Sequence, residues 1–164
     1  MWFKNKPVGL DYFEAAPFRF VNECELNATP EEVFAILADG DTWATWFSDF
    51  RSVKWLTPEP RRAGSQRHVV LKSLQAKEEF LAWEPGRRMA FYMLETTLPI
   101  TACMAEDYQL EPLPNGRSKL SWTAAYTPKP LARVIHPLLR VIFGRMFLSA
   151  TEGLKRYVAA GHRS

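Results

Sequence analysis

The chain has 164 residues, of which 47% are hydrophobic and 13% aromatic, which is enough apolar material for the core of one domain. Its formal charge of +3 comes from interspersed basic and acidic residues, a pattern that excludes the concentrated positive surface of a nucleic-acid-binding protein. No run reaches the roughly 18 apolar residues that span a bilayer, and the N-terminus lacks the apolar stretch of a signal peptide. We therefore expect a cytoplasmic protein without a transmembrane segment.

The first 17 residues are predicted to form an arm that lies on the body of the protein. They mix aromatic and charged residues with Pro7, Gly9 and Pro17, so no period is established. A single domain is then expected over residues 18–164. It begins with an alternating strand from Phe18 to Ala28, in which apolar residues fall on one face and polar residues on the other.

Two short helices are predicted after this first strand. Thr29 can cap a helix, Pro30 suits its first position, and Glu32 completes a capping box. The helix should end at Asp39-Gly40. A second short helix is predicted to hold three aromatic residues, Trp43, Trp46 and Phe47.

Strands alone are predicted over the following 75 or so residues, separated by turn residues. Their expected ranges are 51–56, 66–72, 74–83, 88–97, 101–111 and 118–126. Asn115-Gly116 is the strongest hairpin signal, because both residues tolerate positive φ. In the last strand Trp122 and its alternate neighbours should face inward, while the polar face should meet water. Short connections imply an antiparallel meander that curves around a helix.

That helix is predicted over residues 130–160. Apolar residues recur there at spacings of three and four, which places them on one broad face that the sheet should cover. Pro137 lies within the pattern and should either kink the helix or split off a short first turn. Two interpretations stay open: the helix packs on a solid core, or it forms one wall of a cavity.

Three stretches resemble one known superfamily: residues 28–34 with Trp43 and Trp46 following, residues 78–91 reading EEFLAWEPGRRMAF, and Gly153 to Tyr157. The sequence resembles the START-related, polyketide cyclase and birch-allergen-like superfamily, abbreviated SRPBCC. The resemblance implies an α+β helix-grip fold, in which a curved antiparallel sheet of about seven strands holds the long C-terminal helix. It also implies a cavity for an apolar ligand such as a lipid, sterol, polyketide or quinone.

No motif for a metal, a nucleotide phosphate or a serine nucleophile is present, so we expect no metal and no cofactor. Candidate acid or base residues are therefore isolated: Glu78, His68 and Tyr108. If Glu78 faces the helix, burial should raise its pKa toward neutrality; if the register slips by one residue, Glu79 faces inward instead. His68 lies one strand away and is a candidate partner for Glu78.

Aromatic and sulfur-containing residues should converge on the enclosed space, although a solid core uses the same types. Tyr108 and Trp122 carry polar tips that need a partner when buried, and a ligand oxygen or a water would serve. The candidate ligand-binding residues are Trp46, Phe80, Phe91, Met93, Tyr108, Trp122, Tyr126, Phe143, Met146 and Phe147.

Three functions are consistent with these features. The leading hypothesis is a non-catalytic protein that binds or carries a small hydrophobic molecule between the sheet and the C-terminal helix. The second is an enzyme of the aromatase, cyclase or dehydratase type that moves protons through cavity residues. The third is a module that binds a protein or a membrane surface through an exposed cluster of Trp43, Trp46 and Phe47. Either a monomer or a dimer is compatible with each.

Overall fold

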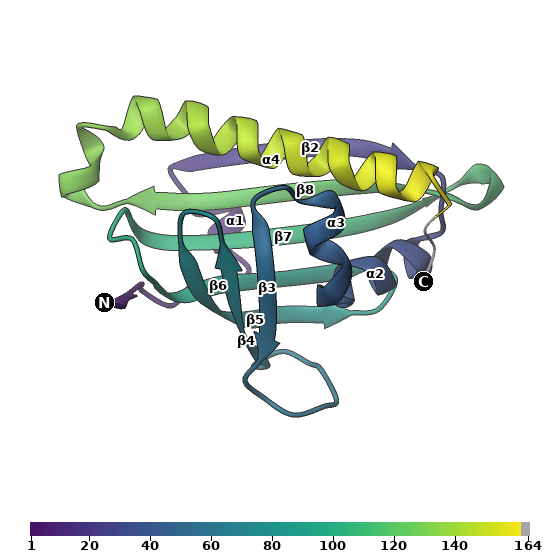
Figure 1. Ribbon diagram of the computed structural model, residues 1–164, viewed down its shortest axis with the longest axis horizontal. Helices are drawn as coiled ribbons and strands as arrows, with labels where there is room; N and C mark the ends of the chain where they lie inside the picture. Colours follow the sequence, from purple (N-terminus) through teal and green to yellow (C-terminus); the bar gives the residue numbers. More distant parts are fainter. Residues whose placement is uncertain (162–164) are drawn as a thin grey trace.

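The computed structural model describes residues 1–161 and shows one strongly curved antiparallel sheet with a long helix, α4, lying along it (Figure 1). The strands are β1 (Phe3–Lys4), β2 (Phe18–Leu26), β3 (Phe50–Trp55), β4 (Gln66–Leu71), β5 (Gln75–Glu84), β6 (Arg88–Thr96), β7 (Thr101–Leu113) and β8 (Arg117–Pro128). The α-helices are α1 (Tyr12–Ala15), α2 (Pro30–Ala38), α3 (Trp43–Trp46) and α4 (His136–Ala159). Three 3₁₀ segments are η1 (Gly40–Thr42), η2 (Pro114–Gly116) and η3 (Pro130–Arg133).

Seven strands follow the order β2-β8-β7-β6-β5-β4-β3, and the two-residue β1 pairs with β6. Every pair is antiparallel, so the predicted meander and the α+β helix-grip fold are confirmed. The hairpin between β7 and β8 turns at Asn115 and Gly116, with φ values of 62° and 67°. Both residues tolerate the left-handed region, which explains why this turn is visible in the sequence.

The capping box predicted for the first helix is present at the start of α2. The Thr29 hydroxyl oxygen accepts a hydrogen bond of 3.3 Å from the Glu32 backbone N–H, and the Glu32 carboxylate accepts one of 2.8 Å from the Thr29 N–H. These reciprocal bonds satisfy two donors that a helix start otherwise leaves unpaired. Apolar residues of α2 and of the following α3 pack in the main core.

The N-terminal arm bridges a gap in the sheet. β6 and β7 pair only as far as Tyr92 and Ala105, and beyond that point they separate. β1 pairs with the free end of β6, where Phe3 lies opposite Thr96, and the Lys6 N–H donates a backbone bond of 2.8 Å to β7. The arm therefore supplies the missing backbone partners at the place where the two strands part.

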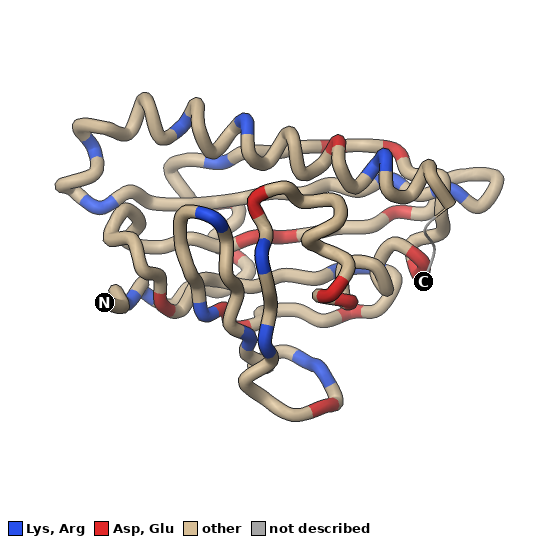
Figure 2. Tube along the Cα trace, viewed as in Figure 1, with Lys and Arg blue, Asp and Glu red and all other residues tan. Residues whose placement is uncertain are grey.

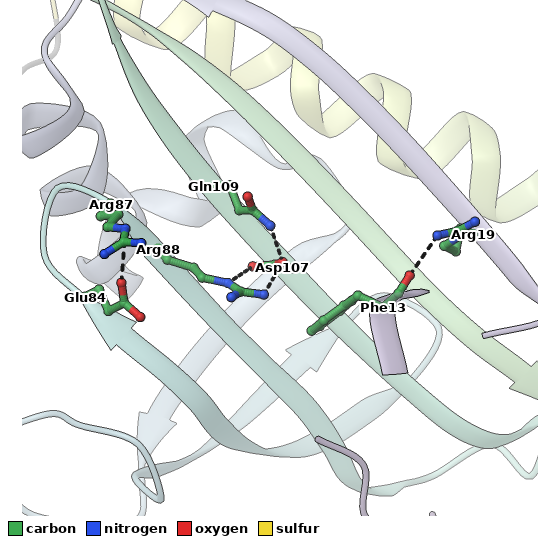
Figure 3. Close-up of polar contacts among 7 residues, drawn as sticks. All are labelled: Phe13, Arg19, Glu84, Arg87, Arg88, Asp107 and Gln109. Atoms are coloured by element: carbon green, nitrogen blue, oxygen red, sulfur yellow. Dashed lines mark hydrogen bonds and ion pairs between the residues drawn. The ribbon is translucent and has the colours of Figure 1, made fainter. Parts of the chain in front are cut away.

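The arm also covers part of the outer face of the sheet, contrary to the expectation that the polar face of the last strand meets water. Ala125 is fully buried in an outer cluster with Phe13 of α1 and alanines of β5, β6 and β7. Arg19 donates a hydrogen bond of 3.0 Å to the Phe13 carbonyl oxygen, which ties the arm to β2 (Figure 3). Small side chains on the strands leave room for this second layer.

A separate group of polar side chains also lies on the outer face. Arg88 donates two hydrogen bonds, of 2.9 and 2.8 Å, to the carboxylate of Asp107, and Gln109 donates a third of 2.8 Å (Figure 3). Because side chains alternate along a strand, the preceding residue, Glu106, faces the opposite side. The two consecutive acids of β7 thus belong to different faces of the sheet.

The predicted C-terminal helix is divided near Pro137. η3 forms a separate turn, and Pro137 lies in the first turn of α4, where its missing N–H breaks no helical bond. Of the two expected effects of this proline, the short segment split from the helix is the one observed. No helix within residues 1–161 is long and apolar enough to cross a membrane.

The C-terminal half of α4 is buried more deeply than its N-terminal half, whose His136 packs on Phe18 and shares a hydrogen bond with Tyr126. Phe147, Ala150, Leu154 and Val158 are buried in the main core. A Cβ atom added at Gly153 would overlap the backbone oxygen of Trp46, so glycine is required for the close approach of α3. The expectation that the sheet covers the whole apolar face was wrong for five of its residues, which are exposed: Leu131, Val134, Ile135, Leu138 and Ile142. The neighbouring Val141 is exposed as well.

Candidate functional site

A cavity lies between the inner face of the sheet, α3 and the middle of α4. Its volume is about 40 Å³. Because one water needs about 10–15 Å³ on this measure, the cavity has room for roughly three waters. A drug-sized ligand would not fit without a change of shape. Apolar side chains form most of its wall. They are Trp43, Phe47, Phe50, Val69, Leu71, Leu74, Ala76, Phe91, Met93, Leu98, Ile100, Met104, Phe143, Met146 and Phe147.

Five of the predicted ligand-binding residues line this cavity, namely Phe91, Met93, Phe143, Met146 and Phe147. The sequence places them there because strand residues of one parity and helix residues at spacings of three and four converge on the space between the two elements. Sheet and helix therefore enclose a small cavity, and the helix forms one of its walls.

The other predicted ligand-binding residues lie behind or beside the cavity wall. Trp122 and Tyr108 are fully buried and stack with ring centroids 4.7 Å apart, and Phe80 packs against Phe91. Tyr126 lies farther along β8, where its hydroxyl shares a hydrogen bond of 2.9 Å with His136. Trp46 is buried against α4 and belongs to the core.

Two charged side chains form the base of the cavity. Arg67 of β4 and Glu78 of β5 are directly opposite each other, and the Arg67 Nε donates a hydrogen bond of 2.6 Å to the Glu78 carboxylate. Both are almost completely buried, with 2% and 4% of their surface exposed. Burial raises the pKa of Glu78, and the positive charge of Arg67 opposes that rise. The register is the one in which Glu78, and not Glu79, faces inward.

Aromatic rings surround the Arg67 guanidinium. Its central carbon lies 5.1 Å from the ring centroid of Trp43, 5.0 Å from that of Phe80 and 4.7 Å from that of Phe91, within the range of cation–π attraction. Within residues 1–161, no side chain or carbonyl accepts a hydrogen bond from either Nη nitrogen. Because a guanidinium has five N–H donors, four of them are left for another acceptor.

Glu106 of β7 is a second acid in the cavity wall and was not among the predicted site residues. The Tyr108 hydroxyl and the Trp122 indole N–H donate hydrogen bonds of 2.9 and 3.0 Å to its carboxylate. Burial, followed by the nearby charge of Glu78, raises the pKa of Glu106 to about 7. The partner that the sequence required for Tyr108 and Trp122 is therefore a protein carboxylate, not a ligand oxygen or a water.

The sequence does indicate that Glu106 faces inward, although only the tertiary structure shows that it lines the cavity. Glu106 has the same parity as Tyr108 on its strand, so any argument that faces Tyr108 inward also faces Glu106 inward. Arg67 is equally visible as the residue between Gln66 and His68 in an alternating strand. Only the pairing of β4 with β5 shows that Arg67 meets Glu78.

His68 does not join this cluster. Strand alternation turns it to the outer face, where its ring lies against Trp2 and its Nε2 shares a hydrogen bond of 2.9 Å with Gln75. The candidate pair of His68 with Glu78 is therefore not formed, because the two side chains lie on opposite faces of the sheet. Within residues 1–161, no three His, Cys, Asp or Glu side chains are grouped so that they could hold a metal ion.

The aromatic cluster after α2 is not a docking surface. Trp43, Trp46 and Phe47 are each at most 5% exposed and pack between the sheet and α4. The interaction hypothesis that rested on their exposure is wrong for these residues. Trp43 and Phe47 instead line the cavity, and Trp46 packs in the core beside it.

Sequence comparison identifies relatives of the whole domain. The family described as polyketide cyclase / dehydrase and lipid transport matches residues 17–159. Uncharacterized proteins of Mycobacterium tuberculosis and Mycobacterium bovis are 38% identical to this chain over 158 residues, which cover 93% of this chain and 92% of each relative.

Solved structures share the fold at low identity. A START superfamily protein from Mycobacterium smegmatis has a TM-score of 0.72 at 12% identity, with 87% of this chain and 97% of that one covered. The ZhuI aromatase/cyclase from Streptomyces sp. R1128 has a TM-score of 0.67 at 19% identity, with 87% and 97% covered. Together with the family match, these similarities show that the chain belongs to the polyketide cyclase, dehydrase and lipid-transport family of the SRPBCC superfamily.

Proposed function

We propose that this protein binds a small, mainly apolar molecule with one oxygen-containing polar end, enclosed between the sheet and α4. The apolar body lies against Phe91, Met93 and Met146, and the polar end meets Arg67 and Glu106. The family fold supports a hydrophobic ligand-binding domain in general. The polar end is our addition, and it rests on the charged base of the cavity.

The observation that carries this proposal is that the Nη nitrogens of Arg67 lack a hydrogen-bond acceptor in the described part of the chain. A buried guanidinium is costly unless its donors are satisfied, and here one donor is bonded to Glu78 while the Nη donors have no acceptor within residues 1–161. A ligand carbonyl or carboxylate would satisfy them by charge-assisted bonds. With a pKa near 7, Glu106 can either donate to the same ligand oxygen or accept from a hydroxyl.

Binding of a larger ligand requires the cavity to widen. Phe143 and Met146 form the helix side of the wall, and both belong to the part of α4 that is only partly covered. Methionine is flexible, and this part of the helix leaves much of its apolar surface exposed, so its displacement loses little buried surface. We therefore infer that the ligand enters by displacing these side chains, together with the N-terminal half of α4.

Thermal unfolding with a panel of fatty acids, sterols, quinones and polyphenols tests the proposal. A ligand at a hundredfold excess over its dissociation constant should add about 2.7 kcal/mol to the free energy of unfolding. The Met146→Trp substitution should abolish this effect by filling the cavity. Leu148→Trp is the matched control, because Leu148 lies on the same helix and points to solvent. If no ligand class raises the melting temperature, the proposal fails.

A second experiment tests the polar end. Arg67→Lys keeps a positive charge opposite Glu78 but removes the paired Nη donors. Affinity for a fatty acid should fall by about tenfold or more, since a charge-assisted hydrogen bond contributes about 1.5–3 kcal/mol, while affinity for the matching hydrocarbon should be unchanged. Arg88→Lys, on the outer face, is the control. Equal losses for both ligands in titration calorimetry would contradict the assigned role of Arg67.

Acid–base catalysis of the cyclase or dehydratase type is the second candidate function. Glu106 favours it, because a pKa of about 7 suits proton transfer at neutral pH and Tyr108 donates directly to it. In that case Glu106→Gln should reduce turnover of a bound polyketide-like substrate at least about a hundredfold with little change in binding. Normal turnover by this variant would exclude Glu106 as the acid or base.

A further inference from the structure

An unpaired apolar surface remains at the start of the C-terminal helix. We call it the α4 patch: Leu131, Val134, Ile135, Leu138, Val141 and Ile142, each at least 49% exposed. Their spacing continues from η3 into α4, so the patch is a stripe along one side of both elements. Scattered exposed leucines are ordinary, but six aliphatic side chains grouped in twelve residues indicate a surface that is covered in use.

The patch is accompanied by positive charge only. No acidic residue occurs from residue 112 to residue 151, whereas Lys129, Arg133, Arg140 and Arg145 occur in or next to the segment that carries the patch; the Arg140 guanidinium lies 5.7 Å from the Phe18 ring of β2. None of these four forms an ion pair with any residue in 1–161. Figure 2 shows the same asymmetry, with only basic positions along the N-terminal half of α4 and the segment before it.

The α4 patch also lies beside one end of the cavity. The Lys129 N–H, at the start of η3, donates a hydrogen bond of 3.0 Å to the Ile100 carbonyl oxygen in the turn between β6 and β7. Leu98 and Ile100 of this turn line the cavity together with Phe143 of α4. The apolar stripe, the cations and this end of the cavity therefore occupy one side of the molecule.

We propose that the α4 patch docks on an anionic lipid bilayer. Its aliphatic side chains would enter the boundary between headgroups and acyl chains, while Arg133, Arg140 and Arg145 would contact lipid phosphates. Long basic side chains suit this position, because their stems lie along apolar surface while the charge stays among the headgroups. Docking would bring this end of the cavity to the membrane, and it does not depend on which ligand the cavity binds.

The positive charge around the α4 patch favours an anionic bilayer over a second copy of the chain as its partner. In a twofold interface the same surface meets itself, so the unpaired cations of one copy would face those of the other. No acid between residues 112 and 151 is present to neutralise them. Anionic phospholipid supplies the opposite charge as well as an apolar interior, and it matches both properties of the patch.

Vesicle flotation tests the proposal with the full-length protein. It should bind phosphatidylcholine vesicles that contain phosphatidylglycerol, bind weakly to phosphatidylcholine alone, and dissociate as salt is raised. Arg133→Gln/Arg140→Gln/Arg145→Gln should weaken binding by roughly a hundredfold, because each cation near an anionic surface contributes about fivefold. Leu138→Ser/Ile142→Ser should reduce binding to both kinds of vesicle.

Matched controls replace residues of the same types elsewhere on the surface. Arg51→Gln/Lys54→Gln/Arg62→Gln removes three exposed cations, and Val21→Ser/Leu56→Ser removes two exposed aliphatic residues. Both should bind phosphatidylglycerol vesicles like the wild type. Equal losses in control and patch variants would overturn the proposal, and so would equal binding to neutral and anionic vesicles.

Two further readouts separate this proposal from its alternatives. Sedimentation in the absence of lipid should show a monomer; a dimer that dissociates in Leu138→Ser/Ile142→Ser would assign the patch to self-association and overturn membrane docking. The patch variants should keep the ligand-induced thermal shift of the wild type in solution. Vesicle binding without any ligand-induced thermal shift would support membrane docking and contradict the proposed ligand-binding function. A ligand-induced thermal shift without vesicle binding would support ligand binding and contradict membrane docking.

Discussion

The two halves of α4 have the same apolar spacing but different surroundings. In the C-terminal half, Leu154 and Val158 are at most 2% exposed and pack in the main core. In the N-terminal half, Leu138 and Ile142 are 63% and 50% exposed. Two causes contribute: α3 packs on the second half of the helix at Gly153, and Leu138 lies about 160° around the helix axis from the buried Leu154.

One half of α4 is therefore fixed in the core, while the other half can be displaced and can change the size of the cavity. Contacts with α3 and the core oppose displacement of the C-terminal half, while the N-terminal half can move at a low cost in buried surface. The helix residues of the cavity, Phe143, Met146 and Phe147, lie at the boundary between the halves. We expect the two halves to differ in their contribution to stability as they differ in burial.

The largest difference is expected between the two glycines of α4. Gly153→Val should prevent folding or destabilise by more than about 4 kcal/mol, because its side chain would occupy the position of the Trp46 backbone oxygen. Gly144→Ala should be tolerated, since the added Cβ would meet only the Phe20 side chain, at 3.3 Å, and alanine favours the helix. Urea unfolding of both variants measures this, and a stable Gly153→Val protein would show that α3 is not tightly docked.

A second large effect is expected from a leucine in the anchored half. Leu154→Ala should lower the free energy of unfolding by about 2–5 kcal/mol, because the side chain is fully buried and its loss leaves a void. Chemical denaturation measures the change in midpoint at constant slope. A loss below about 1 kcal/mol would mean that the core relaxes around the void.

The acid in the cavity beneath the helix should make stability depend on pH. Folded Glu106 keeps its proton up to about pH 7, whereas the unfolded chain releases it near its usual value of 4.5, so stability is lost as pH rises through this interval. Glu106→Gln should match the wild type near pH 4.5 and exceed it by up to about 3 kcal/mol near pH 8.

Thermal unfolding across this pH range measures the difference. Glu111→Gln, an exposed change on the same strand, is the control and should show no such dependence. A constant difference between wild type and Glu106→Gln at all pH values would mean that Glu106 is already ionised at neutral pH in the folded protein.

The smallest effect is expected in the open half of the helix. Leu138→Ala should change the free energy of unfolding by no more than about 0.5 kcal/mol, because the side chain is largely exposed. The same measurement as for Leu154→Ala makes the two leucines a matched pair. A loss comparable to that of Leu154→Ala would show that the N-terminal half is packed in solution. It would contradict the inference that a ligand can displace this half of the helix.

Local patterns in the sequence determined the elements of this fold. The Thr29 capping box predicted the start of α2, Asn115-Gly116 predicted the last hairpin, and strand alternation placed Trp122 and Phe91 on the inner face. Each of these depends on neighbours within a few residues, so a linear pattern is sufficient. The family resemblance supplied the remaining step, the wrapping of the sheet around the helix, and the structure confirms it.

The charged cavity and the exposed half of α4 were decided only by tertiary structure. Arg67, Glu78 and Glu106 lie on three different strands, and the pairing register that assembles them involves residues far apart in the chain. Leu138 and Leu154 both belong to the apolar pattern, but they are about 160° apart around the helix axis. Only the tertiary structure shows that the side of Leu154 meets the core while the side of Leu138 is left open. Periodicity specifies the direction in which a side chain points, whereas burial depends on whether another element lies there.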